Sequence, residues 1–160
     1  MKRKVLFWLL IVIGIIQLVR PSRNLSAGIS NNDIRTTYAI PPGIDAILKR
    51  SCNDCHTNNT IYPWYTNIQP VGWWLQNHVN DGKSHLNFSE FATYAPKRQH
   101  HKLEETVELV KEGEMPLKSY LWMHKEARLS PQDQAALVNW ADALMKEIAI
   151  KHNLPADEKK

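Results

Sequence analysis

A run of apolar residues near the start of the chain is its most pronounced hydrophobic feature. Residues 5–19 are almost wholly apolar, and Lys2, Arg3 and Lys4 precede them. A basic cluster followed by an apolar run is typical of an export signal or an N-terminal membrane anchor. We therefore predict that residues 1–20 form a signal anchor or a signal peptide.

An uncleaved anchor is the favoured alternative. The run of 15 residues is shorter than the roughly 20 needed to cross a bilayer squarely. No clear small-x-small cleavage site follows it, however, and Trp8 and Arg20 are placed for the two interfaces. We expect an inner-membrane anchor with the rest of the chain facing the periplasm. The alternative is secretion to the periplasm after signal cleavage.

The polar stretch that follows separates this segment from a single domain. Residues 21–40 are rich in Ser, Asn and Arg and lack helical periodicity, which predicts a tether. We expect one domain over residues 41–150, followed by a polar tail over residues 151–160.

The first part of this domain has the apolar spacing of a short helix. Ile44, Ile47 and Leu48 recur at helical intervals, and Cys52 and Cys55 continue the same side. The pattern predicts one helix that directs both sulfur atoms toward the core.

A second helix is predicted from near residue 100. Leu103, Val107 and Val110 lie on one face, and Gly113 is suited to end the helix in a left-handed cap.

The last helix has clear start signals in Ser130 as N-cap, Pro131 at the first position and Asp133 in the capping-box position. We expect it to pack against the helix that carries Ile44. Its apolar stripe comprises Leu137, Trp140, Ala141, Leu144 and Ile148. Because no alternating run with hairpin turns occurs, we predict an all-α fold.

The charge of the chain argues against a nucleic-acid partner. The formal net charge is +4, and four basic residues and no acid lie within the first 20 positions. The remaining 16 basic residues balance the 16 acidic ones. No basic surface is therefore left to follow a phosphate backbone.

Both cysteines of the chain lie in residues 51–56, SCNDCH. Two thiols one helical turn apart, followed by an imidazole, suit covalent haem attachment. Each thiol can add to one vinyl group, and the histidine can reach the iron. This motif predicts Cys52 and Cys55 as attachment residues and His56 as the proximal iron ligand.

Three other chemistries compete for the same motif. A thioredoxin-like dithiol needs a strand and a βαβ pattern that this sequence lacks. A zinc site needs two more ligands, and His100 and His101 are the only adjacent pair. A disulfide across so short a loop would stabilise little. We favour haem attachment.

The sixth iron position has several candidates. Met115 follows the predicted helix end and precedes Pro116, so it lies in a loop that can direct its thioether at the iron, although core packing is the alternative. His78, one turn after Trp74, is a competing ligand, and capping or packing is the favoured alternative for it. The other candidates are assigned to the core (Met123, Met145), to polar positions near a pocket edge (His85, His124) or to the surface (His100, His101, His152).

Residues 62–74, YPWYTNIQPVGWW, form an aromatic block expected to wall the haem pocket, to pack in the core, or both. Of Trp73 and Trp74, helical spacing lets only one face the haem.

The blocks SCNDCH, YPWY, HLNFSEF and GEMP, taken together, resemble the bacterial haem-binding domain family. These are small, single-haem c-type cytochrome-like proteins that often carry an N-terminal membrane segment. The resemblance extends over residues 40–145. It implies cytochrome c-like helices around one haem c, held covalently by Cys52 and Cys55, with His56 as proximal and Met115 as distal ligand.

Function depends on the sixth position. With His and Met both bound, one-electron transfer is the chemistry left to the iron, which predicts an anchored electron carrier with a redox partner protein. If Met115 is not bound, a gas or peroxide can bind, which predicts a sensing or binding module. No catalytic His/Arg pair has a convincing spacing, so we do not expect an enzyme.

Overall fold

The computed structural model describes residues 2–155, and this part of the chain is all-helical, as predicted. The α-helices are α1 (Lys2–Ile16), α2 (Ile34–Thr37), α3 (Pro42–Ser51), α4 (Asn53–His56), α5 (Val71–His85), α6 (Pro96–Lys111) and α7 (Pro131–His152). Short 3-10 helices lie between them: η1 (Trp64–Asn67), η2 (Phe88–Thr93), η3 (Tyr120–Trp122) and η4 (Lys125–Ala127).

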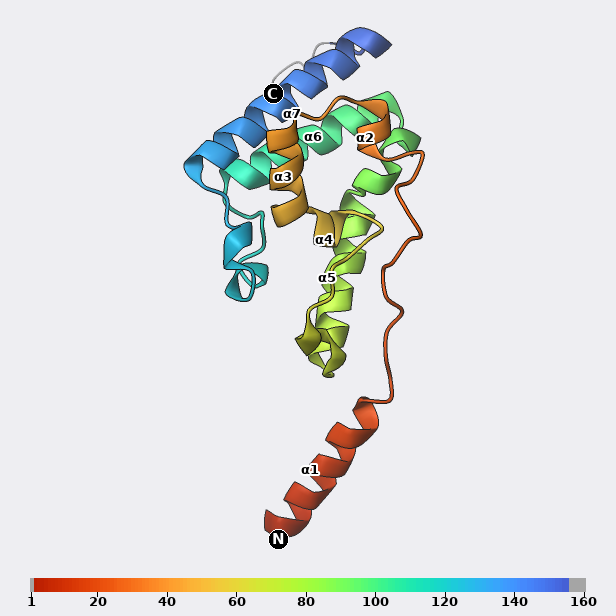
Figure 1. The fold of residues 1–160 in the computed structure, drawn as a ribbon, viewed down its shortest axis with the longest axis vertical. Coiled ribbons are helices and arrows are strands. Elements are labelled where there is room, and N and C mark those ends of the chain that lie inside the picture. Colours follow the sequence, from red (N-terminus) through yellow and green to blue (C-terminus); the bar gives the residue numbers. More distant parts are fainter. Residues whose placement is uncertain (1, 156–160) are drawn as a thin grey trace.

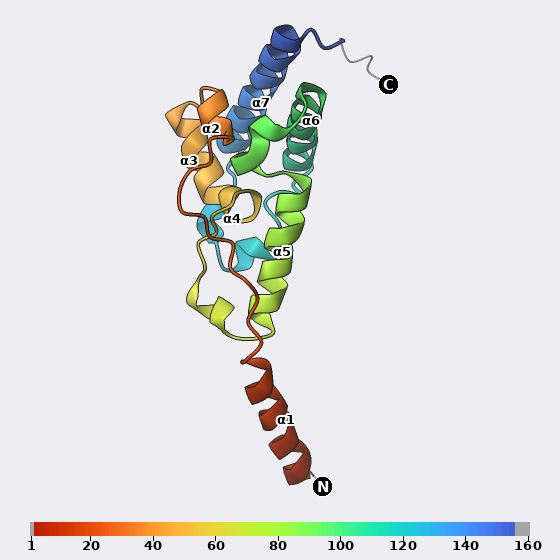
Figure 2. The same ribbon diagram turned by 90° about the vertical axis from the view of Figure 1, so that its right-hand side faces the viewer.

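Helices α6 and α7 pack side by side at one end of the molecule, and α3 packs against α7 (Figure 1, Figure 2). Gly113, with φ of 71°, follows α6 where a left-handed residue was expected. The Ser130 side chain accepts from the Asp133 amide at the start of α7, completing the predicted capping box.

The hydrophobic core lies where α3, α6 and α7 meet. The predicted stripe of α7 is buried, and Ile44, Ile47 and Leu48 of α3 face it. Helix α7 nevertheless packs more extensively against α6 than against α3. The reason is that α6 is the longer helix and presents Leu103, Val107 and Val110 at a matching spacing.

The segment predicted as a tether contributes to this core. Ile34 and Tyr38 are buried, and Asp33 caps α2. Further back, the Asn24 side chain donates to the Thr57 carbonyl at 2.8 Å. The same side chain also donates to the Thr60 hydroxyl at 2.9 Å, and residues 21–40 run along the domain (Figure 1).

The two ends of the chain are built differently. Helix α1 projects away from the other helices, with none of its described residues buried (Figure 2). Within residues 2–155, no helix has the length and apolar character needed to cross a membrane. At the other end, Lys151 and His152 complete α7, whereas residues 156–160 of the predicted tail lie outside the described residues.

Candidate functional site

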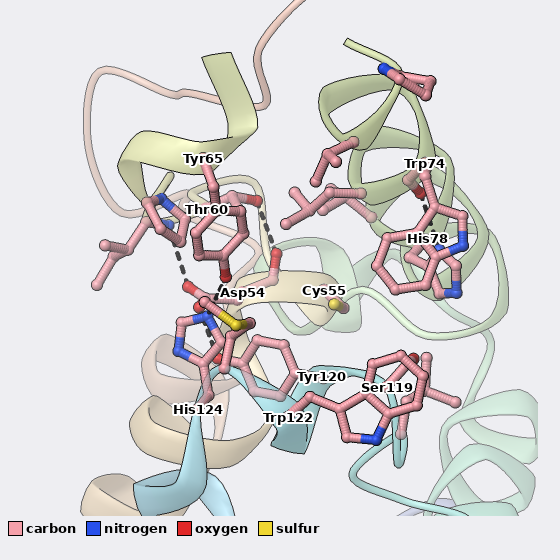
Figure 3. Close-up of a pocket in the computed structure, with 18 residues that line it drawn as sticks. Asp54, Cys55, Thr60, Tyr65, Trp74, His78, Ser119, Tyr120, Trp122 and His124 are labelled. Carbon is pink, nitrogen blue, oxygen red and sulfur yellow. Dashed lines mark hydrogen bonds between the residues drawn. The ribbon is translucent and has the colours of Figure 1, made fainter. Parts of the chain in front are cut away.

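The Cys-X-X-Cys-His motif forms a turn of its own. Helix α3 ends at Ser51, and Cys52 takes φ of −128° and ψ of −40°, so the chain changes direction before α4 begins. The sequence predicted one continuous helix with both sulfur atoms on its core side. The break separates them instead: Cys52 packs against the hydrophobic core, and Cys55 lines a cavity (Figure 3).

A close contact with α5 fixes the position of this turn. A Cβ atom added at Gly82 would lie 2.6 Å from the Cys55 carbonyl oxygen, nearer than side-chain atoms approach in proteins. Only glycine lets the two backbones come this close. Gly82 therefore positions the second cysteine of the motif.

His56 is oriented by a hydrogen bond from its inner ring nitrogen. Its Nδ1 donates to the Leu86 carbonyl, the residue that follows α5, at 2.9 Å. The ring also meets the edge of Phe88 at a centroid distance of 6.3 Å. Because Nδ1 carries the proton, Nε2 has the free lone pair that a metal needs, and such a carbonyl partner is usual for a metal-binding histidine.

Burial controls the charge states of the motif. It lowers the pKa of His56, although the hydrogen bond to Leu86 opposes this, so the imidazole is neutral at neutral pH. Burial also raises the pKa of Cys52 to about 12 and that of Cys55 to about 11, with neighbouring negative charge adding to both shifts. Both thiols are therefore protonated at neutral pH, unlike the activated thiolates of redox dithiols.

Beside the motif lies a cavity of about 720 Å³, within the size range of cofactor sites. Figure 3 shows Cys55 between Trp74 and His78 of α5 on one side and Tyr120 and Trp122 of η3 on the other. The walls are mostly apolar. Further apolar side chains that line the cavity are Ile61, Val71, Leu75, Val79, Leu117 and Met123.

Polar groups gather on one side of this cavity. Tyr120 donates its hydroxyl to Asp54 Oδ2 at 2.7 Å, and Tyr65 Oη lies 2.9 Å from His124 Nε2. The rings of Tyr120 and His124 stack with centroids 4.3 Å apart. Burial, followed by the hydrogen bond to Asp54, raises the pKa of Tyr120, so this hydroxyl stays protonated.

Only part of the aromatic block of residues 62–74 lines the cavity. Tyr65 and Trp74 line the cavity, whereas Trp73 turns away and donates Nε1 to the Val19 carbonyl. His78 and His124 also line it. The core assignment was correct for Met145 but wrong for Met123, which is exposed at the cavity because it follows the short η3 turn rather than lying within a helix.

Met115 packs against the hydrophobic core, two residues before Leu117 of the cavity wall, and is not among the residues that line the cavity in the described part of the chain.

The described residues give no support to the alternative of a zinc site. No group of three or more His, Cys, Asp or Glu residues able to hold a metal ion occurs within residues 2–155. His101 instead pairs with Glu104 and Glu105 on its own helix.

Several residues of the site were not found from the sequence. Leu86 acts through its backbone carbonyl, and backbone acceptors carry no side-chain signal. Gly82 did carry a sequence signal, since a glycine inside a helical pattern often marks a close approach of two backbones. Asp54, Tyr65 and Tyr120 meet only in the folded chain, being up to 66 residues apart.

This donor set fits a haem. Two thiols and an oriented, neutral imidazole lie on one turn. This turn reaches an apolar cavity large enough for a flat cofactor through Cys55, whereas Cys52 and His56 are not among the residues that line it. Fold and site together define an all-helical candidate haem protein.

A family model for the haem-binding domain matches residues 11–143. The chain therefore belongs to the haem-binding domain family, and haem is supported as its cofactor. A comparison with curated proteins and another with solved structures gave no match.

Proposed function

We propose that the chain carries one haem c, attached covalently through Cys52 and Cys55, and transfers single electrons outside the inner membrane. The observation that supports this most directly is the His56 ring, held by the Leu86 carbonyl on the turn whose Cys55 lines the cavity. When bound, the haem supplies the one-electron chemistry.

The protein residues have separate tasks in this proposal. Cys52 and Cys55 hold the group, and the neutral His56 offers Nε2 to the iron. Trp74 of α5 and Leu117 both belong to an apolar wall that limits access of water. Tyr120 stays protonated and directs its hydroxyl at Asp54, so the cavity gains no charge from it.

For the sixth position we propose Met115. Its turn follows Gly113 directly and leads into Leu117 on the cavity wall, so Met115 lies two residues along the chain from that wall. His78 is the alternative. It lines the cavity, and its Nδ1 donates to the Trp74 carbonyl at 2.8 Å, which leaves Nε2 free to bind a metal.

The proposed location is the inner membrane, with residues 1–20 as anchor and the domain in the periplasm. Helix α1 alone is short for this role, but the apolar run continues beyond it to residue 19. A basic N-terminus before an apolar helix supports this orientation, because basic residues are retained on the cytoplasmic side. The partner in electron transfer is proposed to be a redox protein of the same compartment.

Haem staining of the denatured protein tests covalent attachment. The full chain is expressed with a periplasmic cytochrome c maturation system, beside a Cys52→Ala, Cys55→Ala double variant. We expect a stained wild-type band that the double variant lacks. Absence of stain in the wild type, with a control cytochrome stained, would refute the proposal.

The visible spectrum identifies the sixth ligand. A thioether bound to ferric haem gives a weak far-red band. We expect Met115→Ala to lose this band and Met123→Ala, a change of another methionine near the site, to keep it. A wild type without the band, whose spectrum changes in His78→Ala but not in Met115→Ala, would assign the position to His78.

The second candidate function is binding of a small ligand. It is favoured by the position of Met115 outside the cavity lining and by the hydroxyl and imidazole groups of Tyr65, Tyr120 and His124 beside it. Carbon monoxide added to the reduced protein distinguishes the two functions. An immediate spectral change would indicate an open sixth position, and no change would indicate an electron carrier.

A further inference from the structure

An exposed apolar corner lies outside the cavity, at the end of the domain nearest α1. Trp64 of η1 is 73% exposed and Ile68 is 48% exposed. Neither lines the cavity, so a cofactor bound there would leave both uncovered. Leu18 and Val19, which follow α1, are exposed too. We call these four residues the basal corner. An exposed group of large apolar side chains marks an interaction surface.

Hydrogen bonds join the two chain segments of the basal corner. The Gln17 side chain donates from Nε2 to the Gln69 carbonyl at 3.1 Å and accepts from the Gln69 amide through Oε1 at 2.8 Å. Trp73 Nε1 donates to the Val19 carbonyl at 2.7 Å. The end of the apolar helix is thereby held against the residues between η1 and α5.

Together, the two chain segments that supply the basal corner carry basic residues and no acidic ones. No Asp or Glu occurs in residues 5–32 or in residues 55–80, which together supply all four of its members. Arg20 and Arg23 lie beside it: both line a small cavity with Asn67 of η1, and Arg23 donates to Asn67 Oδ1 at 2.6 Å. Exposed tryptophan with flanking arginine and without acid is the composition of a membrane–water interface.

We propose that the basal corner rests on the surface of the bilayer in which α1 is anchored, with Trp64 and Ile68 among the lipid headgroups and the two arginines near anionic phosphates. The inference rests on the proposed anchoring by α1. In both views the start of α5 points toward α1, while α6 and α7 lie at the opposite end (Figure 1, Figure 2). The corner therefore meets the bilayer before any other part of the domain. Tyr65, which follows Trp64 in the chain and contacts its ring, lines the cavity, so the corner adjoins the cavity wall.

Photo-crosslinking to lipid tests this contact. The haem-loaded full chain is placed in nanodiscs of phosphatidylcholine and phosphatidylglycerol, with p-benzoylphenylalanine at position 64. Position 150 is the matched control, because Ile150 of α7 is 79% exposed but lies at the far end of the domain. Position 7, within α1, reports on the anchor. Adducts are identified by mass spectrometry after irradiation.

We expect lipid adducts at positions 7 and 64, with a yield at 64 several-fold above that at 150. Lipid adducts at position 7, together with an adduct yield at position 64 no higher than that at position 150, would overturn the basal-corner contact. The proposed anchor would then still stand. No lipid adduct at either 7 or 64 would overturn both.

Adducts at position 64 to a second copy or to another protein would also overturn the proposal, in favour of a protein contact. The melting curve and haem spectrum of each variant show whether it is folded. Should the position-64 variant not fold, Ile68 provides a second position with the same expected adducts.

Discussion

Replacing Gly82 by alanine tests the contact that positions the motif. The added Cβ atom would stand 2.6 Å from the Cys55 carbonyl oxygen, whereas real Cβ atoms essentially never come within 3.0 Å. Because the obstacle is backbone rather than a flexible side chain, α4 and α5 must move apart. Forced overpacking of this kind costs about 1–3 kcal/mol.

Gly43 provides the matched control. It lies in the first turn of α3, and nothing stands within 4 Å of a Cβ added there. Alanine at either position gains up to about 1 kcal/mol in helix propensity. That gain largely cancels between the two variants, so the difference in their unfolding free energies isolates the clash. We expect Gly82→Ala to be the less stable by about 1–3 kcal/mol.

The assay is urea unfolding of the full-length, haem-loaded chain in detergent, followed by far-ultraviolet circular dichroism. The midpoints of wild type, Gly43→Ala and Gly82→Ala are compared at equal slope. If both alanine variants unfold at the same urea concentration, α4 and α5 do not approach as closely as described, and the role assigned to Gly82 is wrong.

Three further predictions concern α7. Leu137→Ala removes a side chain that is 1% exposed and should lower the free energy of unfolding by about 2–5 kcal/mol. Ile150→Ala on the same helix should change it little, because Ile150 is exposed. Equal unfolding midpoints in urea for the two variants would contradict this. Ser130→Ala removes the N-cap and should cost about 1 kcal/mol, measured the same way. The hydrogen bonds from Ser130, followed by the Arg50 charge, hold the pKa of Asp133 below 3.8. Its stabilising effect is therefore fully present above that ordinary value and is lost as the pH falls through the lower pKa of the folded state. Asp133→Asn should accordingly flatten the decline in melting temperature below about pH 4.

The helices that carry their own start, stop and apolar stripe could be predicted from the sequence. Helix α7 is the clearest case, because Ser130, Pro131 and Asp133 define its start locally. Gly113 in the same way marks the end of α6. Such signals depend on neighbours within a few residues, so they predict helix ends without knowledge of the tertiary structure.

Features that depend on distant segments could not be predicted. The break at Cys52 follows from the packing of α4 on α5, and Gly82 lies 27 positions after Cys55. The polar stretch before α3 looked like a tether because its hydrogen-bonding partners, such as the Thr57 carbonyl for Asn24, are 33 residues away. Periodicity along one segment carries no information about such partners.

Helix α5 links the two ends of the proposed arrangement. Its last turn leads to Leu86, which orients His56, and Trp74 and His78 in its first half line the cavity. Its 15 residues span about 22 Å at 1.5 Å per residue, and the step from Val71 to His78 is only about 10 Å. A basal corner resting on the bilayer would therefore hold this wall of the cavity too close to the membrane for a folded protein to fit between them. A redox partner protein would have to approach from the side where η3 exposes Trp122 and Met123.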